Sequence, residues 1–270
     1  MRCFKISIPF LKIIYMGFVV GITATAPLRA EASHRTEIVS SLLFGEVAEI
    51  LSINGDFSRI RCRYDGYEGW CQTTQLVEIT DEQAHSEGSE LVGDFTNLME
   101  LNGTEIHIPY GASLALFRDN KASFGHYHFT NKGTVVEPDA ALFTPDHIKK
   151  TALNYLHTPY LWGGRTVFGI DCSGYAQQVY RFFNKALPRD AYQQAGLGEV
   201  VGFLQEAVCG DLAFFDNAEG RITHVGIMLD AATIIHSSGR VRIDKIDNVG
   251  IVSSDTGDRT HQLRIIKRYI

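Results

Sequence analysis

The chain has 270 residues, of which 45% are hydrophobic and 21% are charged. These proportions are those of ordinary globular proteins and argue against extended disorder, and the length predicts two or three compact units. The formal net charge is −6, with acidic and basic residues interspersed along the chain. Nucleic-acid binding is therefore not expected, because it needs basic residues clustered on one face.

The N-terminus has the layout of a secretory signal peptide. Lys5 and Lys12 precede an apolar run at residues 13–26, and small residues follow around Ala30. The run is shorter than the roughly 20 residues needed to cross a bilayer, and a retained anchor is the alternative. We predict a signal peptide over residues 1–32 that lies outside the fold, export to the periplasm or the exterior, and no stable membrane span after processing.

Residues 33–80 predict a small β-barrel, because short strands at 47–53 and 59–64 alternate with glycine turns. Cys62 and Cys71 flank the second of these turns and could lie across from one another. In an exported protein such a pair can form a disulfide, while two small buried apolar side chains are an equally consistent interpretation. No pair of cysteines in the chain has the Cys-x-x-Cys spacing typical of metal sites.

Residues 81–143 predict a linker followed by a second small barrel. The stretch at 81–93 is polar and acidic, as expected of a linker or a long loop. The expected strands beyond it are separated by glycine and asparagine turns and lie at 105–108, 113–117, 127–129 and 134–136.

Residues 144–270 predict an α+β domain, with helices first and an antiparallel sheet afterwards. Thr-Pro-Asp at 144–146 combines a helix cap, a proline at the first helical position and an acid in the first turn. A second amphipathic helix follows Asp171 and ends near Asn184. The segments expected as strands are 212–215, 224–229, 233–236, 241–243 and 263–269.

Cys172 has the position of a nucleophile, although a cysteine alone is more often a buried structural residue. It stands behind a glycine-rich loop, at the first turn of the second helix, where the helix dipole and unpaired N–H groups favour a thiolate. Asp171 can cap this helix, and the small residues Ser173 and Gly174 leave room for a substrate backbone. The backbone N–H of Cys172 could then stabilise an oxyanion.

His224 and His236 are expected to meet across a hairpin. If the hairpin turns at Asp230, the two histidines lie directly opposite one another, whereas a slip of one residue would place them on opposite faces. His224 would then accept the proton of the thiol, and His236 would orient His224. A zinc site formed by the two histidines and Cys172 is the alternative, but no clear fourth ligand is present.

These motifs resemble the NlpC family of papain-like bacterial cell-wall cysteine peptidases. The resemblance covers residues 145–270 and includes Thr-Pro-Tyr-Leu-Trp-Gly-Gly, Asp-Cys-Ser-Gly, Leu-Pro-Arg-Asp, Thr-His-Val-Gly-Ile and Ile-His-Ser-Ser-Gly in the family order. It implies a papain-like catalytic domain with a triad of Cys172, His224 and His236. It also implies that no metal or organic cofactor is needed.

The front half resembles the bacterial SH3-like barrels that precede this domain in γ-D-glutamyl-L-diamino acid endopeptidases. In that subgroup the first barrel helps to wall off the cleft, and only peptides with a free N-terminal L-alanine are accepted. The residues that the resemblance implies as substrate contacts are Glu46, Tyr67, Tyr160, Asp171, Ser173 and Asp190. Glu46 and Asp190 would compensate the buried ammonium. Ala191 departs from the subgroup, which often has a small hydroxyl residue there.

The sequence therefore predicts a cysteine endopeptidase preceded by two SH3-like barrels. Its partners would be peptidoglycan stem peptides or murein tripeptides and tetrapeptides. It would cut the γ-D-glutamyl bond to meso-diaminopimelate or lysine and release L-Ala-γ-D-Glu. The alternatives are a cell-wall amidase, a hydrolase of another γ-glutamyl polymer, or a non-catalytic peptidoglycan-binding protein.

Overall fold

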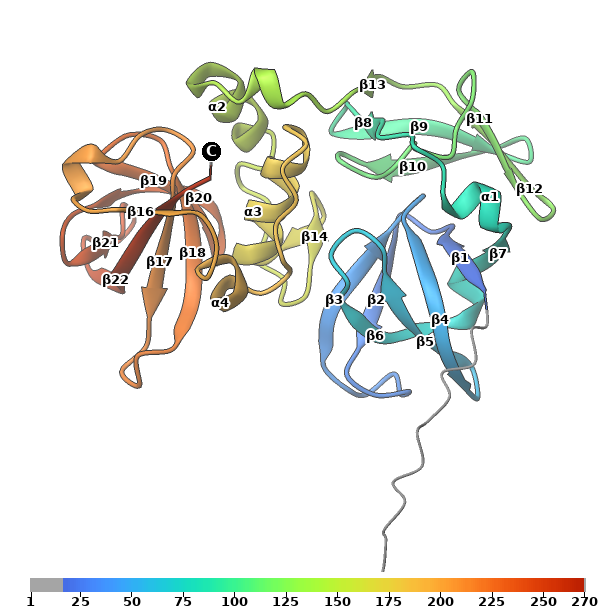
Figure 1. Ribbon diagram of the computed structural model, residues 1–270, viewed down its shortest axis with the longest axis horizontal. Coiled ribbons are helices and arrows are strands. Elements are labelled where there is room, and N and C mark those ends of the chain that lie inside the picture. The colour runs from blue at the N-terminus through green and yellow to red at the C-terminus, as the bar shows by residue number, and fades with distance from the viewer. Residues whose placement is uncertain (1–16, 270) are drawn as a thin grey trace, which may run out of the picture.

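The computed structural model describes residues 17–269, which form three parts in chain order (Figure 1). A first β-barrel is followed by a smaller β unit and then by a mixed C-terminal domain, so the predicted fold class is confirmed. In the described part of the chain, no helix is long and apolar enough to cross a membrane.

The first barrel is an antiparallel sheet with the strand order β3-β2-β6-β5-β4-β1-β7. Alternating burial along β2 and β6 places one face of each strand in the core, as expected for a half-buried strand. The strands are β1 (Phe18–Gly21), β2 (Thr25–Arg29), β3 (Ile38–Leu43), β4 (Val47–Asn54), β5 (Phe57–Cys62), β6 (Glu68–Gln72) and β7 (Leu76–Ile79).

The first two strands overturn one sequence prediction, since they lie inside the segment 1–32 that was placed outside the fold. Val20, Ala26 and Leu28 are fully buried, and β1 pairs with both β4 and β7. The apolar run that resembles a signal core therefore supplies strands of the barrel, and cleavage near residue 32 would remove them. Export itself stays a prediction. The remainder of that segment, residues 1–16, lies outside the described residues.

The β5–β6 hairpin decides between the two interpretations of its cysteines. Cys71 pairs with Ser58, and the backbone N–H of Cys62 bonds to the carbonyl of Tyr67, so the two cysteines are not cross-strand partners. Both are buried and free, as apolar core residues. The turn between the strands uses Gly66 at φ 72°, and Tyr67 follows it directly before β6.

The second β unit packs against the first and partly shares its core. Val20 and Phe44 of the first barrel belong to the same apolar cluster as Met99 and Phe129. The expected strand at 113–117 is wrong, because this segment turns and makes a single isolated bridge, between Ser113 and Leu91. The elements are α1 (Asp81–Ala84), β8 (Leu91–Val92), β9 (Thr96–Leu101), β10 (Thr104–Pro109), β11 (Lys121–Phe124), β12 (Tyr127–Asn131) and β13 (Val135–Val136).

The C-terminal domain packs helices against an antiparallel sheet with the order β16-β22-β17-β18-β19-β20-β21. Its helices are α2 (Pro145–Leu153), α3 (Cys172–Arg181) and α4 (Ala191–Gln194). A short hairpin of β14 (Arg165–Thr166) and β15 (Gly169–Ile170) precedes α3. The sheet strands are β16 (Glu199–Val201), β17 (Leu212–Asp216), β18 (Ile222–Met228), β19 (Thr233–Ser238), β20 (Arg240–Ile246), β21 (Gly250–Val252) and β22 (Arg259–Arg268).

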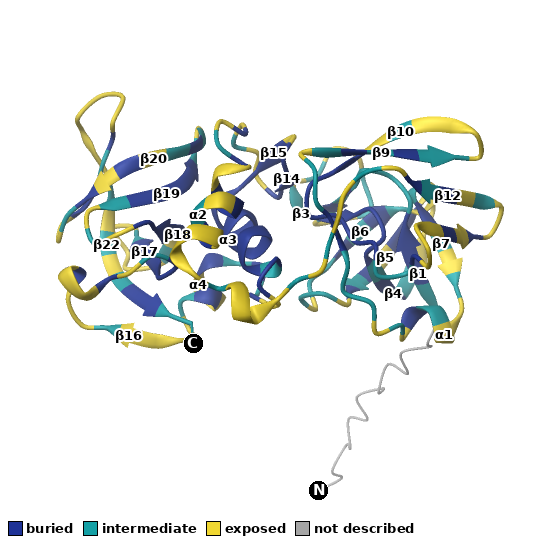
Figure 2. Cartoon of the chain, turned by 90° about the horizontal axis from the view of Figure 1, so that it is seen from above, coloured by how far each residue is buried: buried dark blue, intermediate teal, exposed yellow. Residues whose placement is uncertain are grey.

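Helix α3 is the central element of the molecule. Every residue from Cys172 to Tyr180 is buried, and the helix lies between the C-terminal sheet and the first barrel (Figure 2). Asp171 caps it by accepting a hydrogen bond from the N–H of Gly174 at 2.8 Å. The N-terminus of α3 thus faces both the sheet and the barrel.

Candidate active site

The thiol of Cys172 lies at the N-terminus of α3, with its sulfur bonded by the backbone N–H groups of Val225 and Ser173. Burial raises the pKa of Cys172 to about 12, with a further contribution from the Asp171 carboxylate. The two N–H groups act in the opposite direction but do not compensate burial. Burial therefore opposes the ionisation that the helix N-terminus favours, and a base would assist removal of the proton.

His224 and His236 lie together, although not in the predicted register. The structure pairs His236 with Gly226 rather than with His224, a shift of two residues along the strand. Because side chains two positions apart share a face of the sheet, the two imidazoles still meet. Nε2 of His224 lies 2.8 Å from Nδ1 of His236, and the rings are nearly perpendicular.

Asp244 extends this pair and was missed by the sequence analysis. Its Oδ2 lies 3.0 Å from Nε2 of His236. Burial raises the pKa of Asp244, but hydrogen bonds from His236, Ser254 and Arg242 outweigh it and lower the pKa below its ordinary value. The signal was present in the sequence: a hairpin at Gly239 pairs His236 with Arg242, so Asp244 falls on the same face.

His224 is held neutral by its surroundings. Burial lowers its pKa well below the ordinary value, and the neighbouring His236 and His261 act in the same direction. The ring of His261 stacks on that of His224, with centroids 4.1 Å apart. His224 lies on β18, the strand whose Val225 N–H bonds to the sulfur of Cys172, and a neutral imidazole there can act as a general base for the thiol.

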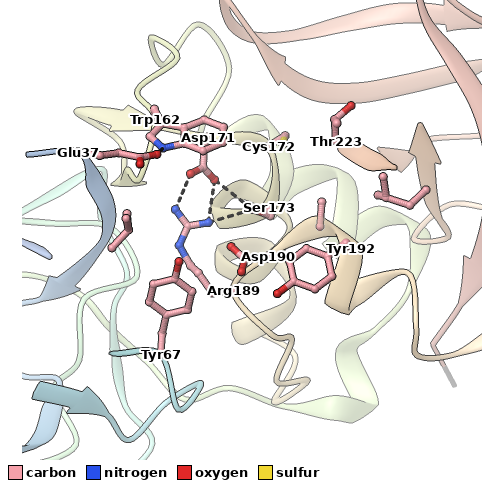
Figure 3. Close-up of a pocket in the computed structure, with 13 residues that line it drawn as sticks. Glu37, Tyr67, Trp162, Asp171, Cys172, Ser173, Arg189, Asp190, Tyr192 and Thr223 are labelled. Carbon is pink, nitrogen blue, oxygen red and sulfur yellow. Dashed lines mark hydrogen bonds and ion pairs between the residues drawn. The ribbon is translucent and has the colours of Figure 1, made fainter. Parts of the chain in front are cut away.

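A cavity of about 430 Å³ opens at Cys172, between the first barrel and the C-terminal domain (Figure 3). Three of its lining residues come from the barrel and the others from the loops around α3 and α4 and from the start of β18. The complete lining is Glu37, Val39, Tyr67, Trp162, Asp171, Cys172, Ser173, Arg189, Asp190, Ala191, Tyr192, Ile222 and Thr223. Tyr160 lies in an adjoining hollow of about 300 Å³ that is also lined by His224 and His261.

Comparison with known proteins decides the family. Residues 157–260 match the model described as "NlpC/P60 family", and residues 28–76 match "Bacterial dipeptidyl-peptidase Sh3 domain". A Bacillus subtilis protein named γ-D-glutamyl-L-lysine dipeptidyl-peptidase is 31% identical over 217 residues, which cover 74% of this chain and 72% of that protein. The chain belongs to the NlpC/P60 family of cysteine peptidases.

Two further relatives agree with this assignment of the NlpC/P60 peptidase. A Bacillus cereus protein of the same name is 26% identical over 260 residues, covering 85% of this chain and 77% of that protein. The crystal structure of a Bacillus cereus NlpC/P60 family protein superposes with a TM-score of 0.74 at 19% identity, over 94% of this chain and 99% of the other. That structure supports the fold across both barrels and the catalytic domain.

Glu46 of this NlpC/P60 peptidase does not take the predicted place in the cavity. Its carboxylate is 4% exposed, and it is bonded to Arg165 at 3.0 and 3.1 Å and to Arg181. Burial raises the pKa of Glu46, but the charges of the two arginines outweigh it and lower the pKa. Glu46 therefore joins the barrel to the catalytic domain. The barrel carboxylate that lines the cavity is Glu37, which accepts a hydrogen bond from Nε1 of Trp162 at 2.6 Å.

Asp171 and Ser173 line the cavity as predicted, but their polar groups are largely engaged within the protein. The Asp171 carboxylate accepts the N–H of Gly163 at 2.9 Å and is paired with buried Arg189. Arg189 also bonds to Ser173 at 2.9 Å and to Ser40 of the barrel at 3.0 Å. Arg189 stands in the Leu-Pro-Arg-Asp motif, yet the sequence analysis assigned it no role. It holds the loop before Cys172 against the barrel.

The geometry does not support the zinc alternative. The facing nitrogens of His224 and His236 are bonded to each other, and the remaining nitrogen of His236 is bonded to Asp244. They do not converge with Cys172 on a common point. Among residues 17–269, no group of three or more histidine, cysteine, aspartate or glutamate side chains is arranged to hold a metal ion.

Proposed function

We propose that this peptidase hydrolyses the γ-D-glutamyl–diamino acid bond of murein-derived peptides that carry a free N-terminal L-alanine, releasing L-Ala-γ-D-Glu. The observation that carries the proposal is the wall that the first barrel places across the cavity at Cys172. The names of the Bacillus relatives support the γ-D-glutamyl bond as the target. The acyl part of the substrate would lie in the cavity of Figure 3, and the diamino acid would leave on the side of His224.

The wall limits the length of the acyl part. Glu37, Val39 and Tyr67 face Cys172 across a space of about 430 Å³, which is in the range of pockets for small ligands rather than of open polymer-binding grooves. A dipeptidyl unit can be enclosed there with its amine against the barrel. A continuing glycan or peptide chain would meet the wall.

The charge of the cavity suits an ammonium. Its lining has three carboxylates and one guanidinium, and the guanidinium of Arg189 is already paired with Asp171. Glu37 and Asp190 then remain to balance a positive charge, with the hydroxyl of Tyr67 as a further hydrogen-bond partner. Burial raises the pKa of Tyr67 to about 12, so its hydroxyl keeps its proton. Glu37 takes the role that the sequence analysis gave to Glu46.

The reaction follows from the geometry around Cys172. His224 would accept the proton of the thiol while the sulfur attacks the γ-glutamyl carbonyl carbon, and the backbone N–H of Cys172 would stabilise the oxyanion. His224 then gives that proton to the nitrogen of the diamino acid as the carbon–nitrogen bond breaks. Water, deprotonated by His224, hydrolyses the thioester and restores the thiol. Burial raises the pKa of Tyr160, which keeps its hydroxyl available as a donor in the adjoining hollow.

The requirement for a free amine also indicates where the substrate comes from. In intact peptidoglycan the alanine nitrogen is part of an amide to the sugar's lactyl group and carries no charge. The carboxylates of the cavity would then be buried without a cationic partner, which is costly. We therefore propose that the enzyme cleaves released murein peptides during recycling rather than intact peptidoglycan.

The test compares L-Ala-γ-D-Glu-L-Lys and its meso-diaminopimelate counterpart with the same peptides acetylated at alanine, with products measured by mass spectrometry. Only the free peptides should yield L-Ala-γ-D-Glu. Cys172→Ala should retain its melting temperature and lose all turnover. Equal rates on free and acetylated peptides would overturn the amine requirement, and undiminished turnover by Cys172→Ala would overturn the mechanism.

A further inference from the structure

The two histidines and Asp244 form one buried line of hydrogen bonds behind Cys172. Each of the three side chains is at most 6% exposed. His236 stands in the middle, with Nδ1 bonded to His224 and Nε2 bonded to Asp244. A neutral imidazole carries its proton on one nitrogen only, so whatever fixes one end of His236 also fixes the other.

The far end of this line can only accept hydrogen bonds. Oδ1 of Asp244 receives hydrogen bonds from Nη2 of Arg242 at 2.9 Å and from N and Oγ of Ser254 at 2.8 and 2.7 Å. The guanidinium of Arg242 already balances the charge of Asp244. The other oxygen, Oδ2, is thus an acceptor for His236, which need not carry a positive charge of its own.

We propose that Asp244 is a positioning residue that sets the proton arrangement of both histidines. It holds the single proton of His236 on Nε2, which leaves Nδ1 of His236 as an acceptor. His224 must then donate from Nε2, and its Nδ1 is left without a proton. That nitrogen is the one remaining to take the proton of Cys172. This inference rests on the proposed roles of Cys172 and His224.

The protons balance without a transfer to Asp244. When the sulfur attacks, its proton moves to Nδ1 of His224, and the imidazolium keeps its Nε2 proton in the bond to His236. When the leaving amine takes the proton from Nδ1, the original arrangement returns. Asp244 stays ionised throughout and stabilises the transient charge on His224 through His236.

Replacement of Asp244 by asparagine should reverse the direction of each hydrogen bond from residue 244 through His236 to His224. Arg242 and the N–H of Ser254 both donate to the Oδ1 position, so the amide oxygen must take that place. The amide NH₂ then faces His236 and donates to Nε2. His236 is forced to carry its proton on Nδ1 and to donate it to Nε2 of His224. The proton of His224 moves to Nδ1, and the base is blocked, although the packing hardly changes.

The matched control is Asp247→Asn, which removes the same charge just beyond the end of β20. Asp247 is half-exposed, pairs with Arg259 and has no bond to the histidine line. Asp244→Asn should lower kcat by about 10³-fold or more with KM changed little, by analogy with triads in which this exchange selects the wrong tautomer. Asp247→Asn should keep the wild-type kcat. A kcat of Asp244→Asn within a few-fold of wild type would overturn the proposal.

Nitrogen-15 NMR of the histidine side chains, recorded without substrate, supplies the deciding readout. Both His224 and His236 should carry their protons on Nε2 in the wild type and in Asp247→Asn, and on Nδ1 in Asp244→Asn. A wild-type protein with His224 protonated on Nδ1 would overturn the proposal even if Asp244→Asn failed to fold. So would an inactive Asp244→Asn with wild-type tautomers. The spectra do not depend on turnover. They therefore test the role of Asp244 even if the enzyme does not cleave the proposed substrate.

Discussion

The two sides of the cleft are built in different ways. The catalytic side places His224, His236 and Asp244 on neighbouring strands of one sheet, where the two-residue period and short hairpins bring them together. The opposite side brings Glu37 and Tyr67 from a separate barrel at the front of the chain. In the proposed function, the chemistry thus depends on local strand geometry, and the selectivity depends on how two domains dock. Two glutamates of the barrel, Glu46 and Glu37, allow the two contributions to be separated.

Glu46→Gln should produce the largest effect, and this effect is on stability. The change leaves buried Arg165 and largely buried Arg181 without a full counter-charge, which costs about 3 kcal/mol of unfolding free energy. Chemical denaturation monitored by tryptophan fluorescence measures the loss. Below the unfolding transition, the preference for a free over an acetylated amine should be retained. A stable Glu46→Gln that has lost this preference would return Glu46 to the substrate site.

Glu37→Gln should have the converse effect. Loss of one charge-assisted hydrogen bond to the ammonium corresponds to about 1.5–3 kcal/mol, or about 10- to 150-fold in kcat/KM on the free peptide. Discrimination against the acetylated peptide should shrink by the same factor, while the unfolding free energy changes by less than about 1 kcal/mol. Steady-state kinetics on both peptides give the comparison. An unchanged ratio would remove Glu37 from amine recognition.

A change of pH near neutrality should affect kcat/KM less than Glu37→Gln does. His224 must be neutral to act as a base, and burial lowers its pKa well below 6.5, so kcat/KM should fall only when the pH drops below that value. Because burial raises the pKa of Cys172 to about 12, alkylation by iodoacetamide should be slow at pH 7 and should still be rising at pH 9. An alkylation rate that levels off near neutral pH would indicate a resting ion pair instead.

The catalytic side was largely predictable because its signals are local. Asp171 before Cys172 predicted the helix cap, and strand alternation tolerated the two-residue error in register between His224 and His236. The ionisation state of the Cys172 thiol in the absence of substrate was not predictable in the same way. The helix dipole can be inferred from sequence, but the burial that outweighs it depends on tertiary packing.

The barrel side was less predictable for a similar reason. Glu46 and Glu37 both lie in turn-rich stretches, and no local pattern shows which one faces a domain far along the chain. The docking of the two domains decides which glutamate lines the cavity, because Arg165 and Arg181 pair with Glu46 whereas Trp162 bonds to Glu37. The apolar run before residue 30 misled for another reason, since a buried strand and a signal core have similar compositions.

The apolar cluster shared by the two β units has a consequence for how the protein unfolds. The rings of Phe44 in the first barrel and Phe129 in the second unit pack edge to face, with centroids 5.1 Å apart, and Val20 packs in the same cluster. A boundary near residue 80 divides the sequence but not this core. The two units should therefore melt in one cooperative transition rather than as separate modules.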